Sequence, residues 1–329
     1  MLTSSRDKAG TELDDWLATG AQAPAGLTLT EGSDPAAFLE AGCDAVVYAS
    51  SGDVRPGEAT AEILAALRSG LCVVTPSVYA LYDPLSAPPD LLRAAREATE
   101  SGSSALFVSG VDPGWGNDVL PLLATGLCSG IRSVRCIEVF DYSTYDQEFS
   151  VRELVGMGMP MDRTPPMVAP GVPTMVWGGQ VRMLARALGL DLDGIEESVE
   201  RVPLESEVST RLGSFAAGTQ GALRFEVAGR VGASSPIVVE HVTRIDPRCA
   251  PDWAQPTTGE GSHRVVVEGT PRLEITVEAE AEGGNRAAGG NATAAMRLVG
   301  ALPWLLEAEP GVYDATQVPI LPGRGRFVL

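Results

Sequence analysis

Histidine and lysine are scarce in this chain of 329 residues. His241 and His263 are its two histidines, and they lie far apart in the sequence. An HExxH zinc site needs two histidines four residues apart on one helix, so this spacing excludes such a site. It also excludes any catalytic motif built on adjacent histidines. Lys8 is the one lysine, and every other basic residue is an arginine.

Paired cysteines and long apolar runs are also missing. The five cysteines form no CxxC motif, and three of them lie in apolar, strand-like runs, which predicts reduced thiols in a core. No run approaches the ~18 apolar residues of a membrane span, and the N-terminus has no signal-peptide core. We therefore expect a cytoplasmic protein without a membrane partner. The cysteines are Cys43, Cys72, Cys128, Cys136 and Cys249.

Positive charge is in short supply. The chain has 24 Lys and Arg against 43 Asp and Glu, a formal net charge of −19. A surface this acidic repels phosphate backbones and anionic lipid, which argues against a nucleic-acid partner. A hydrophobic content of 44% with 20% charged residues is typical of a globular protein. The length suggests about two domains.

The first ~110 residues alternate short apolar runs with helical patterns, as βαβ units do. Such units build a doubly wound, Rossmann-like parallel sheet, which we expect over residues 1–113. The runs are almost wholly apolar, as is typical of buried parallel strands. Strands are predicted at 45–49, 71–75 and 105–108, and helices at 61–67 and 91–99.

The pattern then changes to that of an α+β domain with a mostly antiparallel sheet, expected over residues 114–300. In its last strand Leu273, Ile275 and Val277 alternate with polar residues, as in a half-buried antiparallel strand. Residues 301–329 are expected to return to the first domain. Helices are predicted at 118–127 and 180–188, and strands at 134–140, 222–227, 237–245, 264–268 and 272–277.

No GxGxxG fingerprint lies between a strand and a helix, although a nucleotide-binding domain of this class should open with one. Instead, residues 2–6 resemble the end of a second strand, where such folds bind the adenosine ribose. The side chains there combine hydroxyl groups with cations, which suits a 2′-phosphate and favours NADP, with NAD possible. A solvated tail is the alternative interpretation. The candidate cofactor-binding residues are Ser4, Ser5, Arg6 and Lys8.

Two later loops follow the carboxyl ends of predicted strands, where open α/β sheets bind ligands. Ser50 and Ser51 follow the first of these strands, and Pro76 and Ser77 follow the next. We expect them to border the pyrophosphate and nicotinamide of a cofactor. Ordinary strand-to-helix turns would have the same composition.

Asp112 and Tyr142 are the candidate catalytic residues. Asp112 lies in Gly110–Gly114, where the first domain passes to the second and where a cleft could hold substrate. Asp-Pro-Gly is equally good turn chemistry. Tyr142 follows the 134–140 strand and could donate a proton in a hydride-transfer cleft, or simply pack there.

The candidate substrate-binding residues are mostly aromatic and have structural alternatives. Trp177 and Tyr145 could line a pocket or pack in the core, and Asn117 could cap the following helix. His241 fits best as a satisfied sheet histidine, and no metal site is expected. The candidates are Tyr79, Trp115, Asn117, Tyr145 and Trp177.

Five motifs together resemble the family of dihydrodipicolinate-reductase-like proteins that includes 2,4-diaminopentanoate dehydrogenase and native amine dehydrogenases. In that family a first strand, a glycine turn and a helix precede the segment matching Thr3. The resemblance therefore implies that Met1 is a misassigned start or a truncation, with about 30 residues lost. The motifs occupy residues 3–10, 110–118, 140–145, 171–180 and 289–295.

Two departures from the family narrow the chemistry. The chain lacks the paired histidines and the lysine of true dihydrodipicolinate reductases, so that activity is not expected. Amine dehydrogenases of the family place a glutamate after the strand matching residues 71–75, where this chain has Ser77-Val78-Tyr79 and no carboxylate before Asp83. Tyr79, Tyr82 or Asp112 would have to take the place of that glutamate.

The resulting hypothesis is an NAD(P)-dependent oxidoreductase that moves a hydride to or from a small carbonyl, imine or amine substrate. The alternative is a cofactor-free relic that acts as a binding or oligomerisation module. A sugar- or inositol-type dehydrogenase is disfavoured, because those enzymes use an active-site lysine. The resemblance also implies a homodimer, since the second domains of related proteins commonly pair through their sheets.

Overall fold

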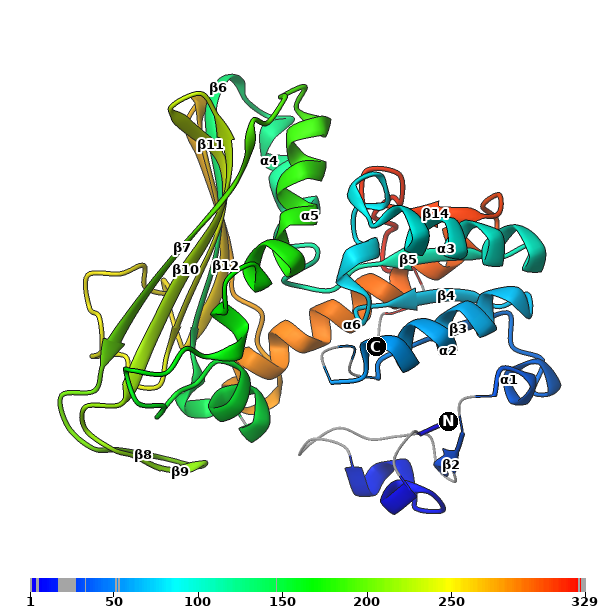
Figure 1. Ribbon diagram of the computed structural model, residues 1–329, viewed down its shortest axis with the longest axis horizontal. Coiled ribbons are helices and arrows are strands. Elements are labelled where there is room, and N and C mark those ends of the chain that lie inside the picture. The colour runs from blue at the N-terminus through cyan, green and yellow to red at the C-terminus, as the bar shows by residue number, and fades with distance from the viewer. Residues whose placement is uncertain are drawn as a thin grey trace.

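The computed structural model describes residues 2–3, 6–16, 28–32, 34–50, 52, 54–145, 147–324 and 326. For Leu2, Arg6, Asp14, Trp16, Glu31 and Glu282 it describes the backbone alone. The chain forms two main sheets that stand side by side (Figure 1).

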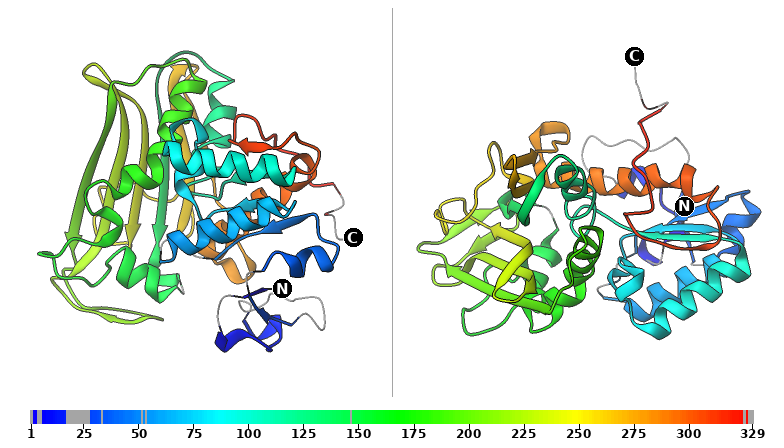
Figure 2. Two further views of the ribbon diagram at one scale, coloured as in Figure 1. Left: turned by 45° about the vertical axis from the view of Figure 1, so that its right-hand side comes forward. Right: turned by 90° about the horizontal axis from the view of Figure 1, so that it is seen from above.

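The first sheet has four parallel strands in the order β14-β5-β4-β3. Two helices cover one face and a third crosses the other, so this part has three layers (Figure 2). β4 and β5 are buried along their whole length, which explains their unbroken apolar sequence. The strands are β3 (Ala45–Val47), β4 (Cys72–Thr75), β5 (Ala105–Val108) and β14 (Gly311–Tyr313). The helices are α2 (Pro56–Arg68), α3 (Pro89–Gly102) and, on the opposite face, α6 (Arg286–Leu305).

The second sheet has six strands in the order β13-β12-β6-β11-β10-β7. Only the central pair, β6 and β11, is parallel, and the other pairs are antiparallel. The predicted fold class is thus confirmed for both parts. The strands are β6 (Ser129–Asp141), β7 (Gly194–Pro203), β10 (Gln220–Val231), β11 (Ser234–Arg244), β12 (Gly261–Thr270) and β13 (Leu273–Val277).

Helices α4 (Val119–Thr125) and α5 (Val172–Ala187) pack on the face of this sheet that looks toward the parallel sheet (Figure 1). α5 begins eight residues earlier than its predicted start at Gln180. Pro173 stands at its N-terminus, where a missing backbone N–H costs nothing, so this proline starts the helix instead of breaking it. The longer α5 brings Trp177 to the boundary between the sheets.

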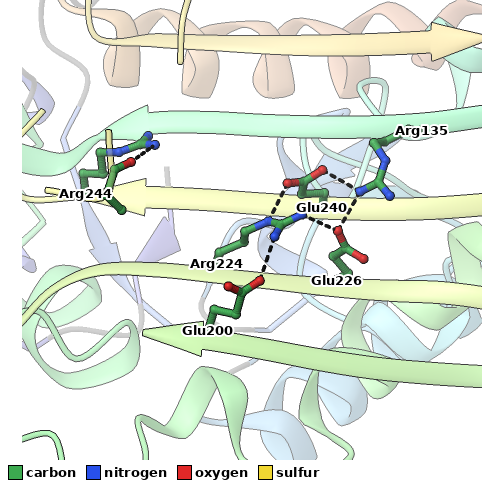
Figure 3. Close-up of polar contacts among 7 residues, drawn as sticks. Arg135, Glu200, Arg224, Glu226, Glu240 and Arg244 are labelled. Atoms are coloured by element: carbon green, nitrogen blue, oxygen red, sulfur yellow. Dashed lines mark hydrogen bonds and ion pairs between the residues drawn. The ribbon is translucent and has the colours of Figure 1, made fainter. Parts of the chain in front are cut away.

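The opposite face of the second sheet carries charged side chains. Arg224 on β10 contacts Glu200, Glu226 and Glu240, and Arg135 on β6 contacts the last two of these (Figure 3). Arg244, fully buried, donates instead to the carbonyls of Cys249 and Ala250 in the following loop.

The remaining elements are small. β1 (Leu2–Thr3) pairs in parallel with β2 (Thr30–Glu31) in a separate sheet of two strands. Residues 2–6 were expected instead to end a second strand of the nucleotide-binding sheet. A hairpin of β8 (Val208–Thr210) and β9 (Gly213–Phe215) extends from the second sheet, and α1 (Ala36–Glu40) precedes β3. Short helical turns used below are η1 (Arg6–Lys8), η3 (Tyr79–Leu81), η5 (Tyr142–Thr144) and η7 (Pro166–Val168).

Candidate active site

A cavity of about 540 Å³ lies where the carboxyl ends of the parallel strands meet α5. Its walls come from the loops after β3, β4 and β5, from η3 and η7, and from α5. Most of the lining is apolar, and Asp112 is the one charged side chain among the described residues that line it. Ligands of open α/β sheets bind at this edge, so the cavity is the candidate active site.

Asp112 is held from two sides. Trp177 Nε1 donates to its Oδ1 over 2.6 Å, and Asn117 Nδ2 donates to its Oδ2 over 3.1 Å. The Asp112 side chain is 1% exposed. The two donors therefore fix the orientation of the carboxyl group in the cavity wall.

Behind Asp112, three neighbouring strands place two histidines on either side of one glutamate. Glu138 on β6 is the direct register partner of His241 on β11 and of His263 on β12. Glu138 Oε2 lies 3.0 Å from His263 Nε2, and its Oε1 lies 3.5 Å from His241 Nδ1. Side chains that face one another across adjacent strands lie on the same face of the sheet, so the register itself builds this His-Glu-His ladder.

His241 links the ladder to Asp112. Its Nε2 lies 2.9 Å from Asp112 Oδ1, yet the ring does not align an N–H with that oxygen, so Nε2 completes no hydrogen bond. The ring stacks on Phe225 with centroids 4.5 Å apart and meets the Trp177 ring edge-on. These contacts hold the imidazole between two carboxylates in a buried place.

The cluster shifts the pKa of its members strongly. Burial opposes a charge on His241, but Asp112 and Glu138 outweigh it and raise the pKa of His241 to about 10. Burial also opposes a charge on Glu138, but hydrogen bonds from His241 and His263 lower its pKa to about 2. Near neutral pH His241 is therefore an imidazolium and Glu138 a carboxylate.

Asp112, Glu138 and His241 also place one metal-ligand atom each within 4.8 Å of one another. Trp177 and Asn117 already donate to both oxygens of Asp112, and each nitrogen of His241 faces a carboxylate. A metal-bound imidazole must be neutral, whereas these neighbours favour the charged ring. The arrangement therefore favours a protonated His241 ring over a bound metal ion.

The loops after β3 and β4 touch at the cavity. Ser77 Oγ donates to the carbonyl of Ser50 over 2.6 Å. Gly52 lies so close to this contact that a Cβ there would meet the Ser77 carbonyl oxygen at 1.8 Å. Gly52 and Ser77 both line the cavity, at the strand ends where open α/β sheets bind their ligands.

The predicted cofactor residues are only partly described. Arg6 and Lys8 lie in η1, directly after β1. Ser4, Ser5 and Ser51 lie outside the described residues. Pro76 lies between β4 and Ser77, with its Cβ close to Gly110 in the loop that carries Asp112.

The predicted substrate residues fall into three places. Tyr79 and Trp177 line the large cavity with Asp112. Trp115 instead lines a second cavity of about 620 Å³ beside α6, where its Nε1 donates to Thr293 Oγ1 over 2.9 Å. Asn117 is buried and positions Asp112, in addition to its place before α4.

Tyr142 and Tyr145 line a third, small cavity of about 50 Å³ with Glu138 and His263. Their rings lie 4.9 Å apart, Tyr142 at the start of η5 and Tyr145 directly after it, and η5 continues directly from β6. The structure therefore separates Tyr142 from the cavity that Asp112 lines. Burial raises the pKa of Tyr142 well above its usual value, with Glu138 adding to the shift, so the phenol stays protonated.

Glu138, His241 and His263 were missed as functional residues. Glu138 is a lone carboxylate in the apolar run from Val134 to Phe140, which is a signal for a buried charge that needs a partner. The sequence offered two histidines as partners. Only the strand order shows that both lie beside Glu138.

The family model of the 2,4-diaminopentanoate dehydrogenase C-terminal domain matches residues 117–323. An amine dehydrogenase from Streptomyces virginiae is 60% identical over 296 residues, which cover 89% of this chain and 82% of that protein. The chain belongs to this dehydrogenase family. The resemblance inferred from the motifs is thus confirmed.

The chain is also similar to a more distant relative and to one solved structure. The 2,4-diaminopentanoate dehydrogenase of Acetoanaerobium sticklandii is 26% identical over 241 residues, which cover 72% of this chain and 64% of that protein. The solved structure of an amine dehydrogenase from Mycobacterium smegmatis has the same fold, with a TM-score of 0.74 at 18% identity. The match covers 98% of this chain and 89% of the M. smegmatis chain.

None of the helices in the described part of the chain is both long enough and apolar enough to cross a membrane. The cytoplasmic location stays a prediction.

Proposed function

We propose that this protein is an NAD(P)-dependent dehydrogenase that interconverts a small amine and the corresponding carbonyl compound. The observation that carries the proposal is Asp112, a fixed carboxylate in the wall of an apolar cavity. A substrate ammonium group would pair with this carboxylate while its carbon skeleton contacts the apolar wall. Membership in a dehydrogenase family supports the hydride-transfer part of the proposal.

Asp112 would take the place of the glutamate that the sequence lacks after β4. Asp83, the next carboxylate along the chain, is 1% exposed and pairs with Arg186, away from the cavity lining. Tyr82 is equally buried and donates to Asp118. Tyr79 lines the cavity and would shape the pocket beside the carboxylate.

The cavity lining also indicates what the substrate lacks. No arginine, lysine or histidine lies among the described residues that line it. A substrate carboxylate would meet Asp112 without any cation to compensate it, which is unfavourable. We therefore propose an amine without a carboxylate, and a substrate small enough for about 540 Å³.

Ser50, Gly52, Pro76 and Ser77 are the described residues that would hold the nicotinamide part of the cofactor. When bound, the cofactor supplies or accepts the hydride. Arg6 and Lys8 would favour the 2′-phosphate of NADP over NAD. The residues of this chain bind and orient the amine and hold its proton at Asp112.

The test is amine-dependent reduction of NADP⁺ and NAD⁺ over a panel of small amines, with Asp112→Asn as the comparison. We expect turnover with apolar primary amines, little turnover with the matching α-amino acids, and a loss of about 10²-fold or more in Asp112→Asn. Unchanged turnover in Asp112→Asn would contradict the proposal. No turnover with any amine and no NADPH binding would favour the cofactor-free alternative.

The homodimer is proposed separately from the activity. It is tested by sedimentation of the full chain over a range of concentrations, with a monomer at all of them as the contrary outcome.

A further inference from the structure

The His-Glu-His ladder behind Asp112 has no place in hydride transfer itself. Burial of its members nonetheless has a large unfavourable desolvation free energy. His241 and His263 are 5% and 3% exposed, and the side chain of Glu138 is 14% exposed. Removing water from charged groups costs several kcal/mol unless partners compensate it. The ladder reaches from the cavity wall at Asp112 to the small cavity at Tyr142.

We propose that His241 stores the proton that amine chemistry requires and exchanges it with substrate through Asp112, while Glu138 and His263 position it. This inference rests on the proposed function and deepens it. His241 Nε2 and Asp112 Oδ1 are 2.9 Å apart, which is within reach of direct proton transfer. Nε2 is buried and otherwise unpartnered, so a small rotation of the ring would align the N–H with Asp112.

The proposed proton transfers balance with the carbonyl compound and the ammonium ion as the only reactants. In the amine-forming direction, ammonia adds to the carbonyl carbon and gives a carbinolamine. The hydroxyl of the carbinolamine takes a proton from Asp112, which has just received it from His241 Nε2. The C–O bond then breaks with its electron pair leaving on water, and the nitrogen lone pair forms the C=N bond of an iminium ion. This step leaves Asp112 as a carboxylate and His241 as a neutral imidazole.

The next ammonium ion restores the charge of His241. It loses one proton to Asp112, which passes it to Nε2, and the ammonia left behind is the next nucleophile. Carbonyl plus ammonium thus gives iminium plus water, with no net proton taken from the protein. In the amine-oxidising direction the same two groups accept the proton that an alkylammonium ion must lose before its carbon can give up a hydride.

Glu138 and His263 act through His241 and are positioning residues. Glu138 Oε1 faces His241 Nδ1, and its Oε2 is held by His263 Nε2. His263 in turn packs between the rings of Trp115 and Phe140, at 5.2 and 5.3 Å. This packing fixes Glu138, and Glu138 fixes the orientation of the His241 ring and favours its charged form.

The titratable groups around the cluster come from every element packed on it. Asp112 approaches from the loop after β5, Tyr142 and Tyr145 from η5, and Cys136 from β6. α5 and β10 contribute Trp177 and Phe225, which do not titrate. Burial raises the pKa of both Tyr142 and Cys136, so Asp112 and Glu138 carry the negative charge around His241.

The scarcity of histidine makes a direct test practical. With two histidines in the chain, ¹⁵N NMR of the imidazoles gives two sets of signals, and His263→Gln assigns them by leaving only His241. We expect His241 to remain charged above pH 8 in the wild type. Glu138→Gln should lower its titration midpoint by about one pH unit or more.

The matched control is Glu200→Gln, the same change on the same sheet. Glu200 lies on the opposite face, in the charged cluster with Arg224, and contacts neither histidine (Figure 3). It should leave the titration of His241 unchanged. A wild-type His241 that titrates near 6.5, or a Glu138→Gln variant that titrates like the wild type, would overturn the inference even if the enzyme oxidises amines.

Activity gives the second measurement. Glu138→Gln should lower kcat at least about tenfold, change the amine KM much less, and move the basic limb of the kcat–pH profile to lower pH, with partial rescue in Glu138→Asp. Loss of folded protein without a moved pH profile would assign a merely structural role. A wild type inactive on every amine would remove the proposed function and the relay with it, whatever the NMR shows of His241.

Discussion

Trp177 Nε1 donates to Asp112 Oδ1 over 2.6 Å, and this bond joins the helix of the second sheet to the loop that leaves the first. Both residues line the same cavity. The indole therefore has two roles. Its ring forms part of the apolar wall, and its N–H orients Asp112, the one charged side chain among the described residues of that wall.

Trp177→Phe separates these two roles, since phenylalanine keeps an aromatic ring but has no donor. Hydrogen bonds to charged groups contribute about 1.5–3 kcal/mol, so we expect kcat/KM for the amine to fall about tenfold or more. Trp304→Phe is the control, because Trp304 lies on α6 against Tyr313 and lines none of the cavity beside Asp112. Steady-state kinetics of the two variants check this, and equal losses in both would contradict a specific role for Trp177.

The pH dependence of stability follows from His241. The folded-state pKa of about 10 lies above the ordinary value of 6.5, so folding is favoured by proton binding. This stabilisation is complete below about pH 6.5 and is lost as the pH rises toward 10. The free energy of unfolding of the wild type, measured against that of His241→Gln by urea denaturation, should therefore show a difference that shrinks over this range. A difference that stays constant from pH 6 to 10 would contradict the shifted pKa of His241.

The change in folding stability at acid pH depends on Glu138. Its folded-state pKa of about 2 lies below its ordinary value of 4.5, so its contribution is complete above about pH 4.5 and is lost as the pH falls toward 2. Glu138→Gln should consequently lose less stability than the wild type between pH 4.5 and 2. Acid unfolding followed by circular dichroism measures this, and parallel curves for the two proteins would rule it out.

A structural feature of this protein can be predicted from the sequence when the interactions that produce it are local in the chain. Three of the four parallel strands were predicted, because an apolar run such as Leu106–Val108 is a local consequence of burial on both faces. The fourth, β14, was not predicted as a strand. The early start of α5 was not, because the proline and glycines near Val172 are equally compatible with a loop. β7 (Gly194–Pro203) was missed because, as an edge strand, it is largely exposed and its sequence is not apolar.

The site shows the same limit more sharply. Asp112 was found because its turn lies between the two parts of the chain. Trp177 and Asn117, which donate to it, were also among the predicted site residues. His241 and Glu138 were not, because His241 is 129 positions from Asp112 and is joined to Glu138 only by the parallel pairing of β11 with β6. Non-consecutive strand order is a property of the whole fold, so no local pattern could place His241 and His263 on either side of one carboxylate.

Gly52 provides a test of the loop contact at the strand ends. A Cβ there would meet the Ser77 carbonyl oxygen at 1.8 Å, so Gly52→Ala must push the two loops apart. We expect NADPH to bind about tenfold more weakly, a change of about 1.4 kcal/mol, measured by fluorescence titration. Gly57→Ala is the control: it lies in α2 with open space around its Cβ position, and it should leave affinity unchanged or stabilise the fold slightly. Equal affinities in both variants would mean that this contact does not shape the cofactor site.

The charged face of the second sheet makes the last prediction. Glu240 on β11 is 5% exposed and accepts hydrogen bonds from Arg135 and Arg224 at 2.6 and 2.7 Å, whereas Glu200 is exposed and pairs with Arg224 alone. Glu240→Gln removes the more buried of the two carboxylates that Arg135 and Arg224 share, and leaves them Glu226 alone as a shared anion. We therefore expect it to lower the free energy of unfolding by about 1–3 kcal/mol. Glu200→Gln removes a solvent-screened pair and should cost less than about 1 kcal/mol.

Urea denaturation at low and high salt distinguishes the two substitutions. The loss of stability in Glu200→Gln should vanish at high salt, and that in Glu240→Gln should persist because its partners are screened less by solvent. Equal costs for the two substitutions would show that burial does not strengthen the cluster.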